Sequence, residues 1–369
     1  MCLSTKSKRH GSWLKVNGEG GGVEMDERQV FVRPNRGLDV DTTISGELPK
    51  EMPLVITKRY DDAKDFLSDI SYGGALYGML NKTIVFRGLQ SATYELIPSA
   101  LRRRIQFKNQ DGTIYKENEE ASVVLSESER LKRSLEYFSL RGFFDACDVN
   151  GLWLPNVERI RKYLVTYKDL NTAGLLTDEW IPYDFLELTA LAQHYGIETR
   201  LLDWTSNIET AIYFAVHKEP DLNEEEEKKE ESKYLAIWLL DTSVEQKSNS
   251  LRFIRPPYKG NPNLAAQKGL FSYWKEPGFK LKSNVIENEE WEEIQKVRIN
   301  RMPLDKRLLH ELGDNMQDKT YMWKLLIPRE GKKELYGYIS RRGVTAASLF
   351  PGYAGIVQSI KEGKEIMSE

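Results

Sequence analysis

The sequence predicts an α+β fold with a mixed sheet core and flanking helices. Several stretches repeat apolar residues at helical spacing, and several apolar runs are too short for a typical helix and indicate strands. The two kinds alternate irregularly, which favours α+β over a regular βαβ array. The 369 residues suffice for one large domain or two ordinary ones.

The chain divides into three parts. Residues 1–25 are rich in Gly, Ser and Lys, and we expect a disordered tail there. Residues 26–59 indicate extended chain interrupted by loops, with a candidate strand in "QVFVRP". We expect them to form an N-terminal extension that packs on the core. Residues 60–365 form the main domain.

The first half of the main domain contains three expected helices and one strand. Residues 60–80 indicate a helix interrupted at Gly73 and Gly74, and "NKTIVFRG" is a short buried strand. Residues 126–151 form an amphipathic helix with Ser126 as its cap. We expect its apolar stripe to comprise Leu131, Leu135 and Phe138. "NVERIRKYLVTY" is a further helix.

The centre of the chain indicates two helices joined by an extended segment. "PYDFLELTALAQHYG" ends at Gly196, which suits a helix stop. "ETRLLDW" is extended, and "SNIETAIYFAVHK" has apolar residues at i, i+3, i+4, i+7 and i+8. Three residues can cap this second helix: Thr205, Ser206 and Asn207.

The second half carries most of the expected strands. "YLAIWLLD", "LRFIRPP", residues 269–274 and "YMWKLLIP" are short apolar runs. "EPDLNEEEEKKEESK" is a solvated acidic loop. The chain closes with a turn, a loop and a helix, and Pro351 suits the first helical turn.

Composition excludes several classes of function. The net charge of -3 offers no global basic field for nucleic acid, and no run of 18 apolar residues predicts a membrane span. The basic N-terminus lacks the apolar region of a secretory signal, so we expect a cytoplasmic protein with no membrane partner. With two cysteines and four histidines we expect no disulfide framework and no metal, and we interpret Cys147 as a small buried residue.

The first candidate site is "VFRG". Arg87 closes an apolar strand, and Gly88 adds no side chain beside it. A guanidinium held at a strand end suits a phosphate or carboxylate. It equally suits a buried carboxylate that orders the core, and the residues alone favour neither interpretation.

The second candidate site is "AQHYGIETRLLDWTS". A helix begins just after Thr205, and a helix N-terminus with Arg200 nearby is an anion site. Trp204 can stack on a ring, and His194 can titrate near neutral pH. Alternatively Asp203 pairs with an arginine, Trp204 fills the core and His194 bonds a carbonyl.

The third candidate site is "NLAAQKGLFSYW". Gln267 can donate and accept hydrogen bonds, and a strand glycine such as Gly269 often marks a close approach by a ligand. The sequence lacks the phosphate-binding loop, the dinucleotide fingerprint and the nucleophile elbow.

The same segments resemble the FRG domain family, named for its Phe-Arg-Gly motif. The resemblance rests on "FRGLQ", "YELIPSALRR", "LTALAQHYGIETRLLDWTSNIETAIYFAV", "AAQKGLF" and "GVTAASLFPGYAGI", and it spans roughly residues 60 to 362. It assigns residues 60–365 to an FRG domain. FRG domains occur in bacterial and phage proteins, which implies a toxin or phage-defence setting.

The order of these motifs is also similar to an ADP-ribosyltransferase fold, by analogy. Arg87 then matches the arginine that holds NAD, Thr205 the Ser/Thr strand, and Gln267 the late strand. That fold carries a glutamate there, whereas Gln267-Lys268-Gly269 has none. Gln267 can bond a ribose hydroxyl but supplies no negative charge, and Asp203 is the candidate replacement.

Two hypotheses follow. In the first, Arg87, Gly88, Arg200 and Thr205 bind an anionic, nucleotide-like ligand, for which NAD is the candidate cofactor, and Trp204 or Tyr195 stacks on its ring. His194, Asp203 and Gln267 are then catalytic in ADP-ribosyl transfer or NAD cleavage. In the second, the polar cluster is a structural network in a non-catalytic module that binds a protein or nucleic acid, with a basic patch at residues 102–104.

Overall fold

The computed structural model describes residues 12–15, 53–80, 83–102, 106–108, 114–116, 122–166, 179–277, 301–313 and 319–368. The chain forms two compact units. Unit 1 comprises residues 1–95, 205–247 and 308–369, and unit 2 comprises residues 96–204 and 248–307. Helices and strands mix in both units, and the predicted α+β class is confirmed. The candidate strand "QVFVRP" lies outside the described residues.

Unit 1 is built on a mixed sheet. Its strands lie in the order β1 (Ser12–Lys15), β2 (Val55–Arg59), β12 (Met322–Pro328), β8 (Tyr234–Asp241) and β3 (Ile84–Leu89). β2 and β12 are parallel, and the other pairs of neighbouring strands are antiparallel. The apolar runs that predicted strands at 234–241 and 321–328 thus form the centre of this sheet, where both faces of a strand are covered.

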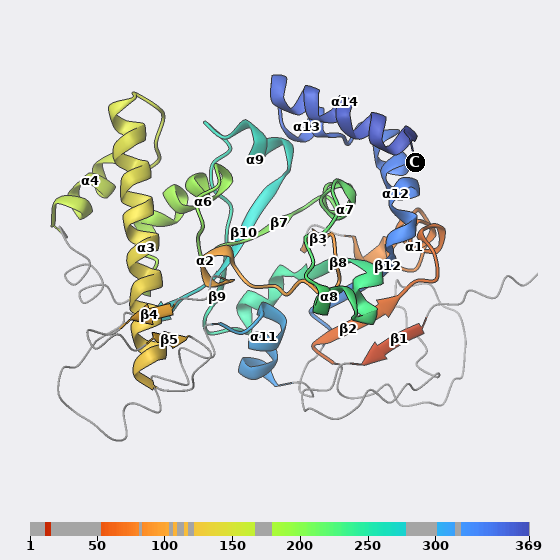
Figure 1. The fold of residues 1–369 in the computed structure, drawn as a ribbon, viewed down its shortest axis with the longest axis horizontal. Coiled ribbons are helices and arrows are strands. Elements are labelled where there is room, and N and C mark those ends of the chain that lie inside the picture. The colour runs from red at the N-terminus through yellow and green to blue at the C-terminus, as the bar shows by residue number, and fades with distance from the viewer. Residues whose placement is uncertain are drawn as a thin grey trace, which may run out of the picture. The chain divides into compact units, whose positions relative to one another are not determined.

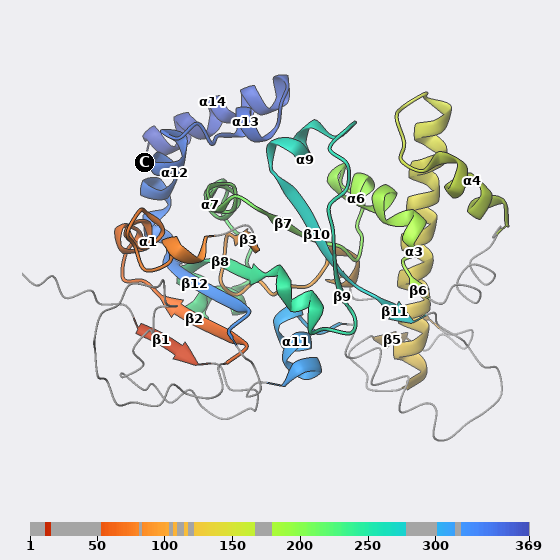
Figure 2. The same ribbon diagram turned by 180° about the vertical axis from the view of Figure 1, so that it is seen from behind.

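One face of this sheet is covered by helices. α1 (Ala63–Ile70), α7 (Ile208–Val216) and α12 (Lys332–Ser340) pack against apolar side chains of β3, β8 and β12 (Figures 1 and 2). Asn207 caps α7, and its side chain accepts a hydrogen bond from Glu209 N at 2.8 Å. α1 ends before the predicted interruption at Gly73, and the short η1 (Tyr77–Met79) follows. The helix predicted within residues 206–218 is confirmed, whereas the one predicted over residues 60–80 is confined to residues 63–70 and the short η1.

The remaining elements of unit 1 are short except the last helix. α8 (Glu224–Glu227), η3 (Glu230–Lys233), η4 (Thr242–Gln246) and η5 (Arg329–Gly331) are single turns, and α13 (Ala346–Leu349) precedes α14 (Tyr353–Ser368). Pro351 lies just before α14 rather than in its first turn. The buried Glu362 of α14 accepts hydrogen bonds from Tyr213 Oη at 2.7 Å and Gln358 Nε2 at 2.8 Å, which fixes α14 against α7.

Unit 2 gathers helices around a second apolar core. α3 (Ser122–Val149), α4 (Val157–Thr166), η2 (Tyr183–Phe185) and α6 (Leu186–His194) contribute to it. The predicted stripe of α3 is wrong, since Leu135 is 50% exposed and Phe138 is 54% exposed. Tyr137, Leu140 and Phe144 point into the core instead. Cys147 is buried as expected, and burial raises the pKa of its thiol.

The strands of unit 2 are short. β10 (Gly269–Trp274) lies between β7 (Leu202–Thr205) and β9 (Leu251–Ile254), and β6 (Glu179–Trp180) pairs with β11 (Glu276–Pro277). β4 (Gln106–Lys108) and β5 (Ile114–Lys116) form a hairpin. The short helices are α2 (Ser99–Arg102) and α9 (Pro262–Ala266), and α11 (Leu304–Leu312) begins here. The strand predicted at 269–274 is confirmed.

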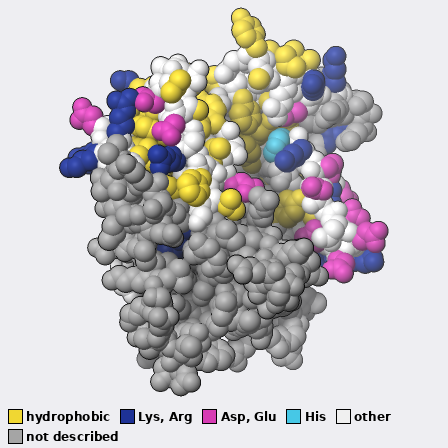
Figure 3. Space-filling model, turned by 60° about the vertical axis from the view of Figure 1, so that its left-hand side comes forward, with side chains coloured by type: hydrophobic (Ala, Val, Ile, Leu, Met, Phe, Trp, Pro, Cys, Tyr) yellow, Lys and Arg dark blue, Asp and Glu magenta, His cyan; other side chains and the backbone are white. Residues whose placement is uncertain are grey.

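The surface mixes side chains of every kind. On the face drawn in Figure 3, hydrophobic side chains lie among basic and acidic ones. Tyr72 and Tyr353 are each 90% exposed. None of the described helices combines the length and the apolar character that crossing a bilayer requires.

Candidate functional site

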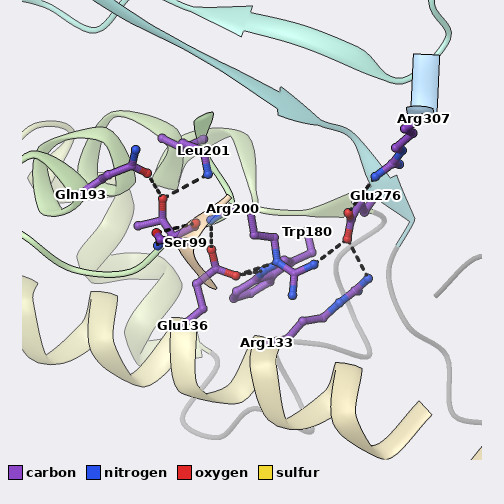
Figure 4. A network of polar contacts seen from close by, with 10 residues as sticks. Ser99, Arg133, Glu136, Trp180, Gln193, Arg200, Leu201, Glu276 and Arg307 are labelled. Atoms are coloured by element: carbon purple, nitrogen blue, oxygen red, sulfur yellow. Dashed lines mark hydrogen bonds and ion pairs between the residues drawn. The ribbon is translucent and has the colours of Figure 1, made fainter. Parts of the chain in front are cut away.

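Arg200 is the centre of a buried ionic network in unit 2. It is 4% exposed, and its guanidinium lies 2.7 Å from Glu136 Oε2 through Nε and 2.6 Å from Glu276 Oε2 through Nη1. Figure 4 shows Arg200 between these carboxylates, with Glu136 on α3 below it and Glu276 on β11 to one side. The sequence predicted that Arg200 binds an anionic ligand. In the structure its guanidinium instead contacts two carboxylates of the chain itself.

Glu136 accepts three hydrogen bonds. Arg200 donates two of them, from its backbone N at 2.8 Å and from Nε, and Trp180 Nε1 donates the third at 2.8 Å. Burial raises the pKa of the Glu136 carboxyl, and the charge of Arg200 and these hydrogen bonds oppose that rise. A carboxylate that accepts from three donors suits the ionised form.

Glu276 also forms ion pairs with two further arginines. Arg133 Nη2 lies 3.4 Å from Oε2, and Arg307 Nη1 lies 3.3 Å from Oε1. Arg307 also lies over the Trp274 ring, 4.1 Å from its centroid. Sequence reasoning missed Arg133, Glu136 and Glu276. The available signal was that Arg133 and Glu136, one helical turn apart, share the α3 face that carries Tyr137 and Leu140.

Trp204 and Thr205 have structural contacts. Trp204 is 3% exposed, and its Nε1 donates to Ser272 Oγ at 2.8 Å across β7 and β10. Thr205 Oγ1 accepts from Asn207 N at 3.0 Å, which shapes the turn into α7. The alternative expected for Trp204, a core residue, therefore matches its surroundings.

Asp203 is held by a chain of polar contacts. Gln193 Nε2 donates to Asp203 Oδ1, and Thr199 Oγ1 donates to Gln193 Oε1. Thr199 is fixed in turn, since its backbone N donates to Ser99 Oγ at 3.2 Å and its Oγ1 accepts from Leu201 N at 3.1 Å. Asp203 itself is exposed, so an ordered carboxylate faces solvent here.

His194 and Tyr195 lie at the end of α6. Their rings meet edge to face with centroids 5.5 Å apart, and Tyr195 is 57% exposed. Burial lowers the pKa of His194, and the charge of Asp203 opposes that decrease. Gly196 has a φ of +97°, which confirms it as the helix stop.

Gln267 does not lie on a strand. It caps the C-terminus of α9, and its backbone N donates to Asn263 O at 2.9 Å. β10 begins two residues later, at Gly269. A Cβ on Gly269 would lie 2.3 Å from Leu264 Cδ1, so the close approach at this glycine is made by α9.

Arg87 and Gly88 lie on opposite faces of the unit 1 sheet. A Cβ on Gly88 would lie 1.8 Å from Ala211 O, so this glycine lets α7 contact β3. Arg87 is half-buried on the other face, where its register partner on β8 is Trp238. Thr205 pairs with the preceding residue, Phe86.

Two residues that the sequence did not single out lie beside Arg87. Trp238 is also the register partner of Lys324 on β12, so Arg87, Trp238 and Lys324 share one face across three strands. Lys324 Nζ lies 5.4 Å from the Trp238 ring centroid and donates to Ala92 O at 3.0 Å. We name these three residues the cationic row. The signal in the sequence was a lysine inside the apolar run "YMWKLLIP".

The basic patch predicted at residues 102–104 lies only partly within the described residues. Arg102 is exposed, and residues 103 and 104 lie outside the described part of the chain. Among the described residues no group of three His, Cys, Asp or Glu side chains is arranged to hold a metal ion.

Comparison with known proteins identifies the central segment. Residues 155–224 match the family model of the FRG domain. The chain contains an FRG domain. The match runs from α4 through α7 and includes Gln193, His194, Arg200 and Asp203, whereas Arg87 and Gln267 lie outside it. No curated protein and no solved structure matches the chain, and the similarity to ADP-ribosyltransferases is not confirmed.

Proposed function

We propose that this FRG-domain protein binds an anionic, nucleotide-like ligand at the cationic row of unit 1. The observation that carries the proposal is the register of Arg87 and Lys324, two cations that flank one tryptophan on the same sheet face. Both cations are half-buried, so low-dielectric surroundings strengthen their attraction for an anion. A planar guanidinium adds paired donors that match phosphate oxygens.

The spacing of the row suits a diphosphate. Neighbouring strands lie about 4.8 Å apart, so the backbones at Arg87 and Lys324 are separated by roughly 10 Å. The long side chains of both residues can converge from there on phosphate groups between them. NAD and ADP-ribose carry such a diphosphate, and NAD is the ligand to test first.

A separate catalytic proposal concerns unit 2 by itself. In NAD cleavage or ADP-ribosyl transfer, positive charge develops on the ribose as nicotinamide leaves, and a carboxylate stabilises it. Asp203 is the candidate carboxylate because Gln193 orients it while it stays exposed. His194 is the candidate proton carrier, and the family resemblance suggests a toxin or phage-defence role.

One observation favours the non-catalytic alternative for part of the cluster. Arg200, which sequence reasoning gave to the ligand, is enclosed with Glu136 and Glu276. In a module that binds a protein or nucleic acid, this network would stabilise the fold and would not contact a ligand. The two candidate functions differ in whether nicotinamide is released.

The test measures binding and turnover separately. Titration calorimetry with NAD and ADP-ribose is expected to show binding that Arg87→Ala weakens tenfold or more, about 1.4 kcal/mol. Arg341→Ala, an exposed arginine of unit 1, is the matched control and should bind as the parent does. Chromatography of NAD incubations is expected to show nicotinamide release that Asp203→Asn abolishes.

Each part of the proposal can fail alone. Absence of binding by any nucleotide, or equal losses in Arg87→Ala and Arg341→Ala, would refute the ligand site. Binding without nicotinamide release, in a protein that stays folded, would refute the catalytic proposal and keep the ligand site.

A further inference from the structure

We infer that the indole N–H of Trp238 is a third donor of the cationic row, and that the row takes a phosphoryl dianion such as pyrophosphate or a terminal phosphate. The inference rests on the proposed function and names the chemical group that the site recognises. It assigns a binding role to Trp238, a residue outside the FRG match at 155–224.

The starting observation is a buried donor. Trp238 is 4% exposed, and its Nε1 is shielded from solvent. In the part of the chain that the structure describes, no acceptor lies within hydrogen-bonding range of this atom. Trp204 Nε1 and Trp180 Nε1, by contrast, donate to Ser272 and Glu136. Buried polar groups are nearly always hydrogen-bonded, and an exception calls for an explanation.

The position of this donor supplies the explanation. Trp238 stands between Arg87 and Lys324 on one face, so its N–H belongs to the same row as both cations. An oxygen anion attracted by the two cations is the acceptor that the indole lacks.

Lys324 has a hydrogen bond that a ligand can replace. Its ammonium group lies over the Trp238 ring and donates to the carbonyl of Ala92. A hydrogen bond from an ammonium to an anionic oxygen is stronger than one to a neutral carbonyl. The half-buried lysine can therefore exchange Ala92 O for an anionic oxygen of the ligand.

The charge of the row selects the ligand. The cationic row has two positively charged side chains, and its next register neighbour, Thr57 on β2, is uncharged. Two cations and a neutral donor match a group with two negative charges and several oxygens. A phosphoryl dianion has both, whereas a carboxylate monoanion has one charge and two oxygens.

The experiment uses the full chain and inorganic pyrophosphate as the probe. Trp238→Phe keeps an aromatic ring and removes the N–H, and Trp323→Phe, on the opposite face of β12, is the matched control. We expect Trp238→Phe to weaken pyrophosphate binding about tenfold, as one lost hydrogen bond to a charged group would. Trp323→Phe should bind as the parent does. Replacement of Trp238 by benzothienylalanine, which has the shape of tryptophan without the N–H, serves if the Phe variant does not fold.

A direct readout follows the N–H itself. In protein labelled with ¹⁵N-tryptophan, the indole signal absent from Trp238→Phe is assigned to Trp238. Pyrophosphate is expected to shift this signal downfield more than those of the other indoles, and acetate at the same concentration should not.

The outcomes separate this inference from the proposed function. Nucleotide and pyrophosphate binding that Arg87→Ala weakens but both Trp238 variants leave unchanged would overturn the role of Trp238 and keep the site. Equal binding of acetate and pyrophosphate would overturn the dianion. Absence of binding by nucleotides and pyrophosphate alike would refute the site as a whole.

Discussion

Glu136 shows how much of unit 2 depends on one carboxylate. It accepts from Arg200 and Trp180, and Arg200 continues to Glu276. Burying these charges is costly, and the hydrogen bonds between them offset that cost only while each partner is present. Removing Glu136 takes from the buried Arg200 one of its two carboxylate contacts and leaves Trp180 Nε1 without its acceptor.

We therefore predict that Glu136→Gln lowers the free energy of unfolding by about 3–5 kcal/mol. Urea denaturation measures this loss. The control is Asp184→Asn, which breaks the exposed pair with Arg159 at 3.2 Å and should cost within about 1 kcal/mol. Similar losses in the two variants would show that the buried network does not stabilise the fold.

His194 makes stability depend on pH. Burial lowers its pKa, so the folded protein binds the proton less tightly than the unfolded chain does. The unfolded chain then binds more protons as the pH falls through about 6.5, and the free energy of unfolding decreases, at most by about 1.4 kcal/mol per pH unit for one proton.

We predict that His194→Gln reduces this loss of stability on acidification. Urea midpoints at about pH 8 and about pH 5.5 bracket the ordinary histidine pKa. His217, whose pKa burial also lowers, remains in the variant and accounts for part of the residual slope. An unchanged difference between the two midpoints would mean that His194 titrates alike in both states.

At the scale of elements, Gly88 controls how closely α7 packs on β3. A methyl group there would lie 1.8 Å from Ala211 O, a backbone atom that moves only with the helix. We predict that Gly88→Ala destabilises the protein by about 1–3 kcal/mol, as overpacking does. Thermal unfolding measures this change.

The control for Gly88 is a glycine with free space. Gly142 lies in α3, is exposed, and would meet no atom within 4 Å of an added Cβ. Gly142→Ala should stabilise the protein by about 0.5–1 kcal/mol through helix propensity. If Gly88→Ala stabilised the protein as Gly142→Ala does, α7 would have room to shift away from β3.

Helix α3 shows where pattern reading failed. Leu131, Leu135 and Phe138 have helical spacing, yet Leu135 and Phe138 are half-exposed. The buried face includes Arg133 and Glu136, which a hydrophobicity pattern assigns to solvent. Because the partners of these charges lie far along the chain, at Arg200 and Glu276, no local pattern could identify that face.

At the scale of the molecule, the sequence predicted elements better than contacts. The helices 186–194 and 208–216 and the strands 234–241 and 269–274 follow from periodicity and from stop signals such as Gly196. The roles of the arginines depend on pairing between distant strands. Trp238 was not singled out because its importance comes from its register with Arg87 and Lys324.

The two arginines that the sequence placed in one hypothesis now separate into two roles. Arg200 is enclosed in unit 2 with Glu136 and Glu276, whereas Arg87 is half-buried in the cationic row of unit 1. Removing Arg200 leaves two buried carboxylates short of a cation, a defect of folding. Removing Arg87 takes away one charge at a partly exposed position, a defect of binding.

We predict that Arg200→Ala lowers the urea midpoint strongly and that its folded fraction binds pyrophosphate with unchanged affinity. Arg87→Ala should do the reverse, with a midpoint near that of the parent and affinity reduced at least tenfold, about 1.4 kcal/mol. Measuring both quantities on both variants gives a crossed comparison in which each protein is the control for the other. If Arg200→Ala loses affinity while it remains folded, or Arg87→Ala unfolds without loss of affinity, this division between a folding arginine and a binding arginine is wrong.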